Sequence, residues 1–150
     1  MVTTKEQLYN YCISLLNKKR MEIEARISLL QTSLTSESKS TAGDKHETGR
    51  AMIQLEREKL GNQLKQLEFQ EAVLHKIQPD KAAELVVLGA YVETESMCYY
   101  LSVPLGKITL ESKEIYAISP QSPIGSLLLG KKVGEEITFN GKTSKIKAIY

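Results

Sequence analysis

The chain has 150 residues, of which 41% are hydrophobic and 25% are charged, with a formal net charge of +2. This composition is typical of an ordinary folded chain of one domain or two small ones, and it excludes a disordered protein. There is no run of 18 apolar residues, and the N-terminus lacks the basic start and the cleavage site of a secretory signal, so we expect a cytoplasmic protein with no membrane partner.

The first half of the chain has a helical period. Apolar residues recur at steps of mostly three and four over residues 5–34 and again over residues 53–74, where Pro79 supplies a stop signal. Charged residues interrupt the two narrow apolar stripes at Lys19, Arg57 and Glu71. Because stripes of this kind can be buried only against each other, residues from about 5 to 77 are predicted to form an antiparallel coiled-coil hairpin, a projecting rod.

The two helical stretches are joined by a segment rich in Ser, Thr and Gly, which places the tip of the hairpin at about residues 35–48. This tip contains Asp44 and Glu47. Their spacing is compatible with a helix cap, in which Glu47 completes a capping box. It is equally compatible with two carboxylates on one side of a helix that bind a metal ion. The residues themselves leave both interpretations open.

From Ala82 onward, short β-rich runs with alternating polarity predict an antiparallel sheet. Asn140-Gly141 predicts a two-residue hairpin turn, and residues 122–132 predict one short helix from Pro123 to about Leu129. The fold class is therefore α+β, with a coiled-coil hairpin over residues 1–78 and a sheet domain over residues 79–150, hinged near Pro79.

Few residues indicate chemistry by their type alone. Cys12 and Cys98 have no CxxC partner, which favours small buried side chains over a disulfide or a zinc site. His46 and His75 have no clustered ligand partners, so the chain is expected to hold no metal or cofactor of its own. The basic run at residues 18–20 has acidic neighbours, which favours a solvated face over a phosphate contact.

Two longer stretches carry a resemblance. The segment "ISPQSPIGSLLLGKKVGEEITF", residues 118–139, and the earlier "VVLGAYVETESMCYYLSV", residues 86–103, resemble the C-terminal part of the Gre family of bacterial transcript-cleavage factors. The hairpin is similar to the same family in its architecture and in a Gly-Asp-x-x-Glu pattern at its tip, residues 43–47. The chain therefore resembles a divergent branch of this family.

The resemblance implies an accessory factor of RNA polymerase that is not itself an enzyme. An FKBP-like C-terminal domain would dock on the polymerase, with Ser122, Pro123 and Ile124 at or near the docking surface. The coiled coil would enter the secondary channel, where Asp44 and Glu47 would help to hold a Mg²⁺ ion of the polymerase active site and stimulate cleavage of backtracked RNA. The factor would contact that RNA only indirectly and act as a monomer. For residues 122–124, packing of the short helix on the sheet is an equal alternative.

The tip departs from the family pattern. Thr48-Gly49-Arg50-Ala51 stands where the family has Asn-Ala-Glu-Tyr, and Lys45 stands where it has Leu. A non-cleaving regulator that binds the secondary channel is therefore an alternative, as is a coiled-coil interaction protein unrelated to transcription. A prolyl isomerase is disfavoured, because fold alone does not fix function and the domain offers only Phe139 besides tyrosines as an aromatic lining.

Overall fold

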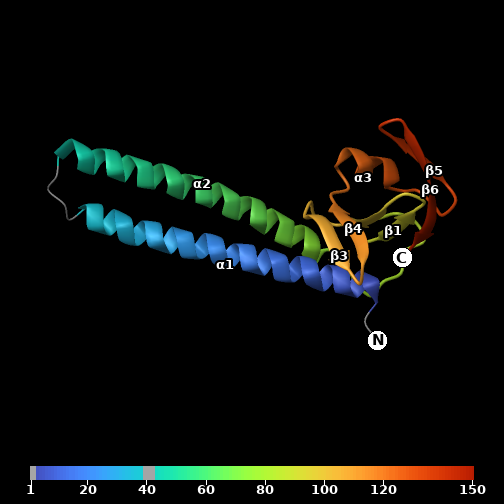
Figure 1. The fold of residues 1–150 in the computed structure, drawn as a ribbon. Coiled ribbons are helices and arrows are strands. Elements are labelled where there is room, and N and C mark those ends of the chain that lie inside the picture. Colours follow the sequence, from blue (N-terminus) through green and yellow to red (C-terminus); the bar gives the residue numbers. More distant parts are fainter. Residues whose placement is uncertain (1–2, 39–42) are drawn as a thin grey trace. The chain divides into compact units, whose positions relative to one another are not determined.

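A computed structural model describes the backbone of residues 3–38 and 43–150 and the side chains of residues 3–35 and 48–150 (Figure 1). The chain divides into two compact units. The hairpin unit comprises Ser14–Glu71, and the sheet unit comprises the N-terminal residues up to Ile13 together with Ala72–Tyr150. Both long helices therefore contribute their ends to the sheet unit. The predicted domain boundary between residues 78 and 79 stays a prediction about which fragments fold separately.

The two predicted helices are present as α1, Thr4–Ser38, and α2, Gly43–His75. α1 begins with a capping box, because the Glu6 N–H donates to Thr3 Oγ1 (3.1 Å) while the Thr3 N–H donates to the Glu6 carboxylate (3.0 Å). α2 ends in a tightened turn in which the Ile77 N–H donates to the Leu74 carbonyl (3.0 Å), two residues before Pro79. The prediction of two long helices is confirmed.

In the hairpin unit, the helices pair along a seam of positions that alternate by three and four residues. On α1 these positions are Leu16, Arg20, Ile23, Ile27, Leu30 and Leu34. On α2 they are Ile53, Arg57, Leu60, Leu64, Leu67 and Glu71. Leu16, Leu60 and Leu67 are buried, whereas most of the other positions are half-buried. This strict alternation is the heptad pattern of a two-stranded coiled coil.

The sheet unit contains a six-stranded sheet in the order β3-β4-β2-β1-β6-β5. The strands and the short helix are β1 Tyr91–Thr94, β2 Cys98–Leu101, β3 Gly106–Leu110, β4 Lys113–Ile118, α3 Pro123–Leu128, β5 Glu136–Phe139 and β6 Lys142–Ile149. All neighbouring pairs are antiparallel except β2 and β4, which are parallel. This pair departs from the predicted antiparallel sheet, because the chain first forms edge strand β3 and then returns in the direction of β2.

The second departure from the sequence prediction is that the β-rich part, predicted from Ala82 onward, forms its first strand only at Tyr91. Only Tyr91–Thr94 forms a strand, while Gly89 has a φ of +91° and donates its N–H to the Leu101 carbonyl (2.6 Å). A positive φ interrupts an extended chain. Val86 upstream pairs instead with the segment after α3, accepting from the Gly130 N–H (2.8 Å) and donating to the Lys131 carbonyl (2.9 Å).

The sheet is packed on both faces. A core on one face includes α3 through Leu128, together with Val86, Ala90, Val92, Tyr99, Leu101, Ile137 and Ile146. Tyr100 is adjacent to Tyr99 on β2 and so points to the opposite face. Burial raises the pKa of the Tyr100 hydroxyl, and the charges of Cys12 and Tyr9 of α1 raise it further. The start of α1 therefore packs on this second face, where Leu8 and Cys12 are also fully buried.

The hairpin turn between β5 and β6 is confirmed. Phe139 pairs with Lys142, and the two residues between them, Asn140 and Gly141, have φ angles of +52° and +78°. Both central residues of a type I′ turn need a positive φ, which is why Asn-Gly is favoured here.

Candidate functional site: the hairpin tip and the α3 surface

The two acids predicted at the tip lie in the first turns of α2. The helix begins at Gly43, so Asp44 is inside its first turn, and Glu47 follows three residues later. Positions with this spacing lie on the same side of a helix, and negative charge is favoured near the positive end of the helix dipole. Their side chains lie outside the described residues. The proposed metal role and the capping role therefore both stay predictions.

Two carboxylates alone do not make a resident metal site, although their chemistry fits a shared one. Mg²⁺ prefers oxygen ligands and is usually held by one or two carboxylates, several waters and substrate phosphates. Among the side chains that the structure describes, no three His, Cys, Asp or Glu residues gather closely enough to hold a metal ion. Asp44 and Glu47 are thus of the right type to add ligands to an ion held mainly by another molecule.

The segment predicted to dock begins with a helix cap. The Gly125 N–H donates to Ser122 Oγ (3.1 Å), and the Ser122 hydroxyl donates to the Ser119 carbonyl (2.6 Å). Pro123 occupies the first turn of α3, where a missing N–H costs nothing. A Cβ at Gly125 would lie 2.1 Å from the Ser119 carbonyl oxygen, so the backbone approach at this position requires glycine. Ser122 therefore has a structural role in forming α3.

The three predicted docking residues differ in exposure. Pro123 is exposed, whereas Ser122 and Ile124 are half-buried. Ile124 packs against the core that contains Leu128. Sequence reasoning missed three apolar side chains on and after α3 that are exposed to solvent. They are Leu127 (39% exposed), Leu129 (47%) and Val133 (55%). Packing accounts for Ser122 and Ile124, while Pro123 and these three side chains remain available to a partner.

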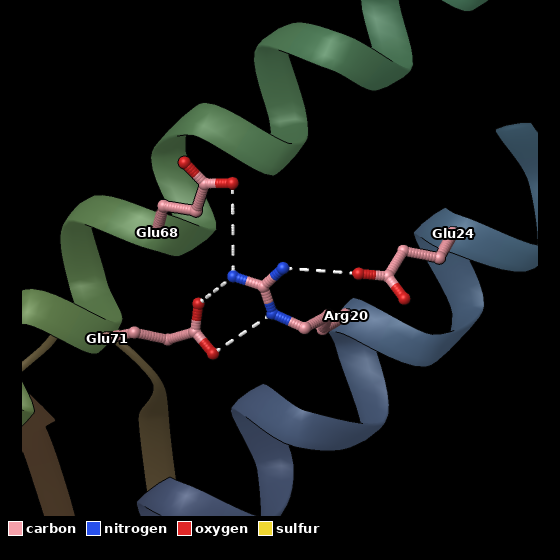
Figure 2. Close-up of polar contacts among 4 residues, drawn as sticks. All are labelled: Arg20, Glu24, Glu68 and Glu71. Carbon is pink, nitrogen blue, oxygen red and sulfur yellow. Dashed lines mark hydrogen bonds and ion pairs between the residues drawn. The ribbon is translucent and has the colours of Figure 1, made fainter.

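A second polar group, absent from the predicted site, joins the two helices of the hairpin unit (Figure 2). Arg20 of α1 donates from Nη2 to Glu71 Oε1 (2.5 Å) and from Nε to Glu71 Oε2 (3.2 Å) on α2. Its Nη1 donates to Glu24 (3.1 Å), and Glu68 lies 3.9 Å from Nη2. These contacts, first with Glu71 and then with Glu24, raise the pKa of Arg20. Within the basic run, Arg20 is therefore occupied, while Lys18 and Lys19 are exposed.

The sheet unit also contains a cavity of about 440 Å³. Tyr91 and Tyr150 form one wall, with their rings stacked at 5.5 Å, and Lys113 lies 3.4 Å from Glu93 beside them. Phe139 is not part of the lining. Lys113 and Glu93 form an ion pair in this wall, and Lys5, Asp80 and Lys81 also line the cavity.

None of the helices in the described part of the chain is long and apolar enough to span a membrane.

A search of curated proteins gives no match. Among solved structures, the chain is similar to GreA factor homolog 1 (Gfh1) of Thermus thermophilus, at 21% identity and a TM-score of 0.35, covering 95% of this chain and 94% of that one. Gfh1 of Thermus aquaticus gives 22% identity and a TM-score of 0.34, over 95% of this chain and 93% of that one. Neither likeness is close enough to transfer a property.

The family comparison is more specific. Residues 86–149 match the family described as "Transcription elongation factor, GreA/GreB, C-term". The matched region runs from the segment before β1 through the last strand, β6, and includes α3 with its Ser122 cap. The chain therefore contains a GreA/GreB C-terminal domain over residues 86–149.

Proposed function

We propose that this chain binds RNA polymerase through its C-terminal domain, inserts the hairpin into the secondary channel and stimulates cleavage of backtracked RNA. The observation that carries the proposal is the GreA/GreB C-terminal domain at residues 86–149, in a chain whose hairpin has two carboxylates in the first turns of α2. Neither feature alone is sufficient, because helix starts often carry acids and a domain does not define a reaction.

The two acids would act as ligands and not as a complete active site. A Mg²⁺ ion in the polymerase active centre supplies the chemistry, by activating water and stabilising the leaving oxygen. Asp44 and Glu47 would each offer a carboxylate oxygen to this ion and would thereby fix its position against the RNA phosphate. A neutral amide at either position would be a weaker ligand for a hard cation.

Docking would use the exposed surface around α3. Pro123, Leu127 and Leu129 are exposed on one short helix and its end, and α3 is held rigidly by the Ser122 cap and the buried Leu128. Protein interfaces gain from preformed apolar anchors, because little conformational entropy is lost on binding. We therefore assign the main polymerase contact to this surface.

A non-cleaving regulator of the secondary channel is the second candidate, and the tip residues favour it. Lys45 lies between the two acids in the sequence, and Arg50 follows them within α2. Their positive charges would oppose the binding of a further cation nearby, since like charges repel at short range. Such a factor would occupy the channel and inhibit the polymerase without promoting cleavage.

A cleavage assay on stalled elongation complexes separates the two candidates. The full chain is expected to accelerate RNA cleavage, and Asp44→Asn with Glu47→Gln is expected to reduce this stimulation at least 10-fold while leaving polymerase binding intact. The amides preserve shape and much of the capping capacity, so a loss would reflect the charge. Binding without any acceleration by the parent protein would support the non-cleaving regulator. Full stimulation by the double variant would exclude the metal role.

A binding assay tests the docking surface. Leu127→Ser removes an exposed apolar side chain of α3 and is expected to weaken polymerase binding about 10-fold. Met97→Ser is the matched control, because Met97 is similarly exposed (43%) but lies in the turn between β1 and β2. Equal affinities for both variants would place the contact elsewhere.

A further inference from the structure

We propose that the ion pair between Arg20 and Glu71 sets the register of the two helices in the hairpin unit, and thereby the position at which the tip presents Asp44 and Glu47. The statement about the tip rests on the proposed function. The statement about the register does not.

Arg20 and Glu71 both occupy seam positions, and the remaining seam positions, apart from Arg57, are Leu or Ile. Their side chains are 32% and 19% exposed, so both are partly withdrawn from water. A charged pair at such a site is often no more stable than a well-packed apolar pair, because both charges lose hydration. A role beyond simple stability is therefore needed to explain the pair.

The apolar seam positions discriminate poorly between alternative registers of the two helices. Ile23, Ile27 and Leu30 on α1 face a partner helix whose seam repeats Leu60, Leu64 and Leu67. A groove of about 320 Å³ is lined by both Ile23 and Leu67, so these two residues lie near each other in the present register. If α1 moved along α2 by one seam position, about 5 Å, Leu and Ile would again meet Leu and Ile at little cost.

The charged pair removes this ambiguity. In the present register the guanidinium makes two hydrogen bonds to one carboxylate, with Glu24 and Glu68 beside it (Figure 2). After a shift by one seam position, Arg20 and Glu71 would each face an apolar residue and lose this geometry. Unpaired charges in such places are strongly disfavoured, and a polar residue at a seam position is a recognised means of fixing register.

The chain provides its own control. Arg57 is the other charged residue on the α2 seam, but it is exposed, and no ion pair to it is present among side chains 3–35 and 48–150. If charge at a seam position were sufficient, Arg57 would matter as much as Arg20. If the pair is what counts, replacing Arg57 leaves the register unchanged.

Distance measurements between spin labels test the register directly. Labels are attached at Ser28→Cys on α1 and Gln54→Cys on α2, both exposed, in the full chain with Cys98→Ser so that only the buried Cys12 remains. The parent, the charge swap (Arg20→Glu with Glu71→Arg) and Arg57→Leu are expected to give the same single distance. Arg20→Leu with Glu71→Leu is expected to add a population displaced by about 3–5 Å.

A single, unchanged distance in the Leu/Leu variant would overturn the proposal. Glu71→Gln is measured in parallel because it is almost isosteric and keeps the helices folded, and an unshifted, unbroadened distance there would count against the proposal equally. The Leu/Leu variant is then assayed for RNA cleavage, where at least a 5-fold loss with unchanged helicity is expected. Since the distances are measured without polymerase, failure of the proposed function would leave the register result intact.

Discussion

The hairpin unit and the sheet unit are stabilised in different ways. In the sheet unit, side chains are buried on both faces of the sheet, and the backbone approach at Gly125 leaves no room for a Cβ. In the hairpin unit, burial is confined to one seam, and large apolar residues such as Met21, Leu55 and Phe69 are exposed. The family match covers residues 86–149 and none of the hairpin unit. A seam fixes a pattern of residue classes, whereas a core enclosed on both faces fixes particular residues.

The largest loss of stability is expected for a substitution at Gly125 in the sheet unit. Gly125→Ala places a Cβ against the Ser119 carbonyl oxygen (2.1 Å) and Ser122 Oγ (2.8 Å), so the cap of α3 has to shift. We expect a loss of about 3 kcal/mol in the free energy of unfolding. All seven tyrosines lie in the sheet unit, so urea unfolding followed by tyrosine fluorescence reports on it. Unchanged stability would show that the cap adapts.

Two leucines compare the core with the seam directly. Leu128→Ala in the core is expected to lower the free energy of unfolding by about 3 kcal/mol. The surrounding side chains are held in place and cannot fill the cavity that the substitution leaves. Leu67→Ala in the seam is expected to cost about 1 kcal/mol less, since two helices can approach each other and fill part of the space. Unfolding followed by both tyrosine fluorescence and helical circular dichroism gives the two values. Equal costs would contradict the difference between the units.

A pH effect is expected where α1 packs on the sheet. Burial raises the pKa of the Cys12 thiol to about 11, and the Ser102 hydroxyl offsets this only in part. A raised thiol pKa means that the folded state binds the proton more tightly, so stability is full below about pH 9 and falls as the pH rises toward 11. Between pH 8 and pH 10, the free energy of unfolding of Cys12→Ala should fall by about 1 kcal/mol less than that of the parent.

The comparison is made in a reducing buffer by urea unfolding at both pH values. Burial is the main cause of the raised pKa of Tyr100 and acts in both proteins, and Cys12 adds a smaller part, so most of the difference reports on Cys12. Parallel losses in the two proteins would place the thiol outside the packed face.

The smallest expected effect is a gain. Gly61 lies in the interior of α2, and a Cβ there would meet no atom within 4 Å. Gly61→Ala is therefore expected to raise helix stability by about 0.5–1 kcal/mol. Thermal unfolding monitored by helical circular dichroism measures it. A loss instead of a gain would mean that the hairpin unit is packed more tightly than its exposure indicates.

The elements that the sequence predicts well are those set by local chemistry. The period of the helices, the Asn140-Gly141 turn and α3 between Pro123 and Gly130 depend on neighbouring residues, and the structure contains all of them. The parallel pairing of β2 with β4 and the burial of Cys12 against the sheet depend on contacts between distant segments. Periodicity identifies an apolar face but not what covers it.

The candidate site shows the same limit. Asp44 and Glu47 were identified by their spacing and by family resemblance, because their chemistry is visible in residue types. Arg20 and Glu71 are 51 residues apart in the chain, and their pairing depends on the register of the two helices, which periodicity does not provide. A signal is present on α2, where the sequence indicates Glu71 on the apolar stripe, but on α1 it indicates Lys19 as the interrupting residue, which is exposed, whereas Arg20 lies in the seam. The exposure of Leu127 and Leu129 could not be predicted, because their helix is apolar on most sides.

The position of β6 has a consequence for the order in which the chain folds. β6, Lys142–Ile149, lies between β1 and β5, and Val92 of β1 pairs with Ile149. During synthesis, the sheet therefore cannot close until residue 149 has left the ribosome, whereas the helical segments are made of local contacts and can form earlier. Until then, β1 lacks its neighbour on one edge, whereas β2 already has β1 and β4 beside it. The sheet unit is thus expected to fold late and slowly, and the nascent chain is most exposed to aggregation just before its last strand arrives.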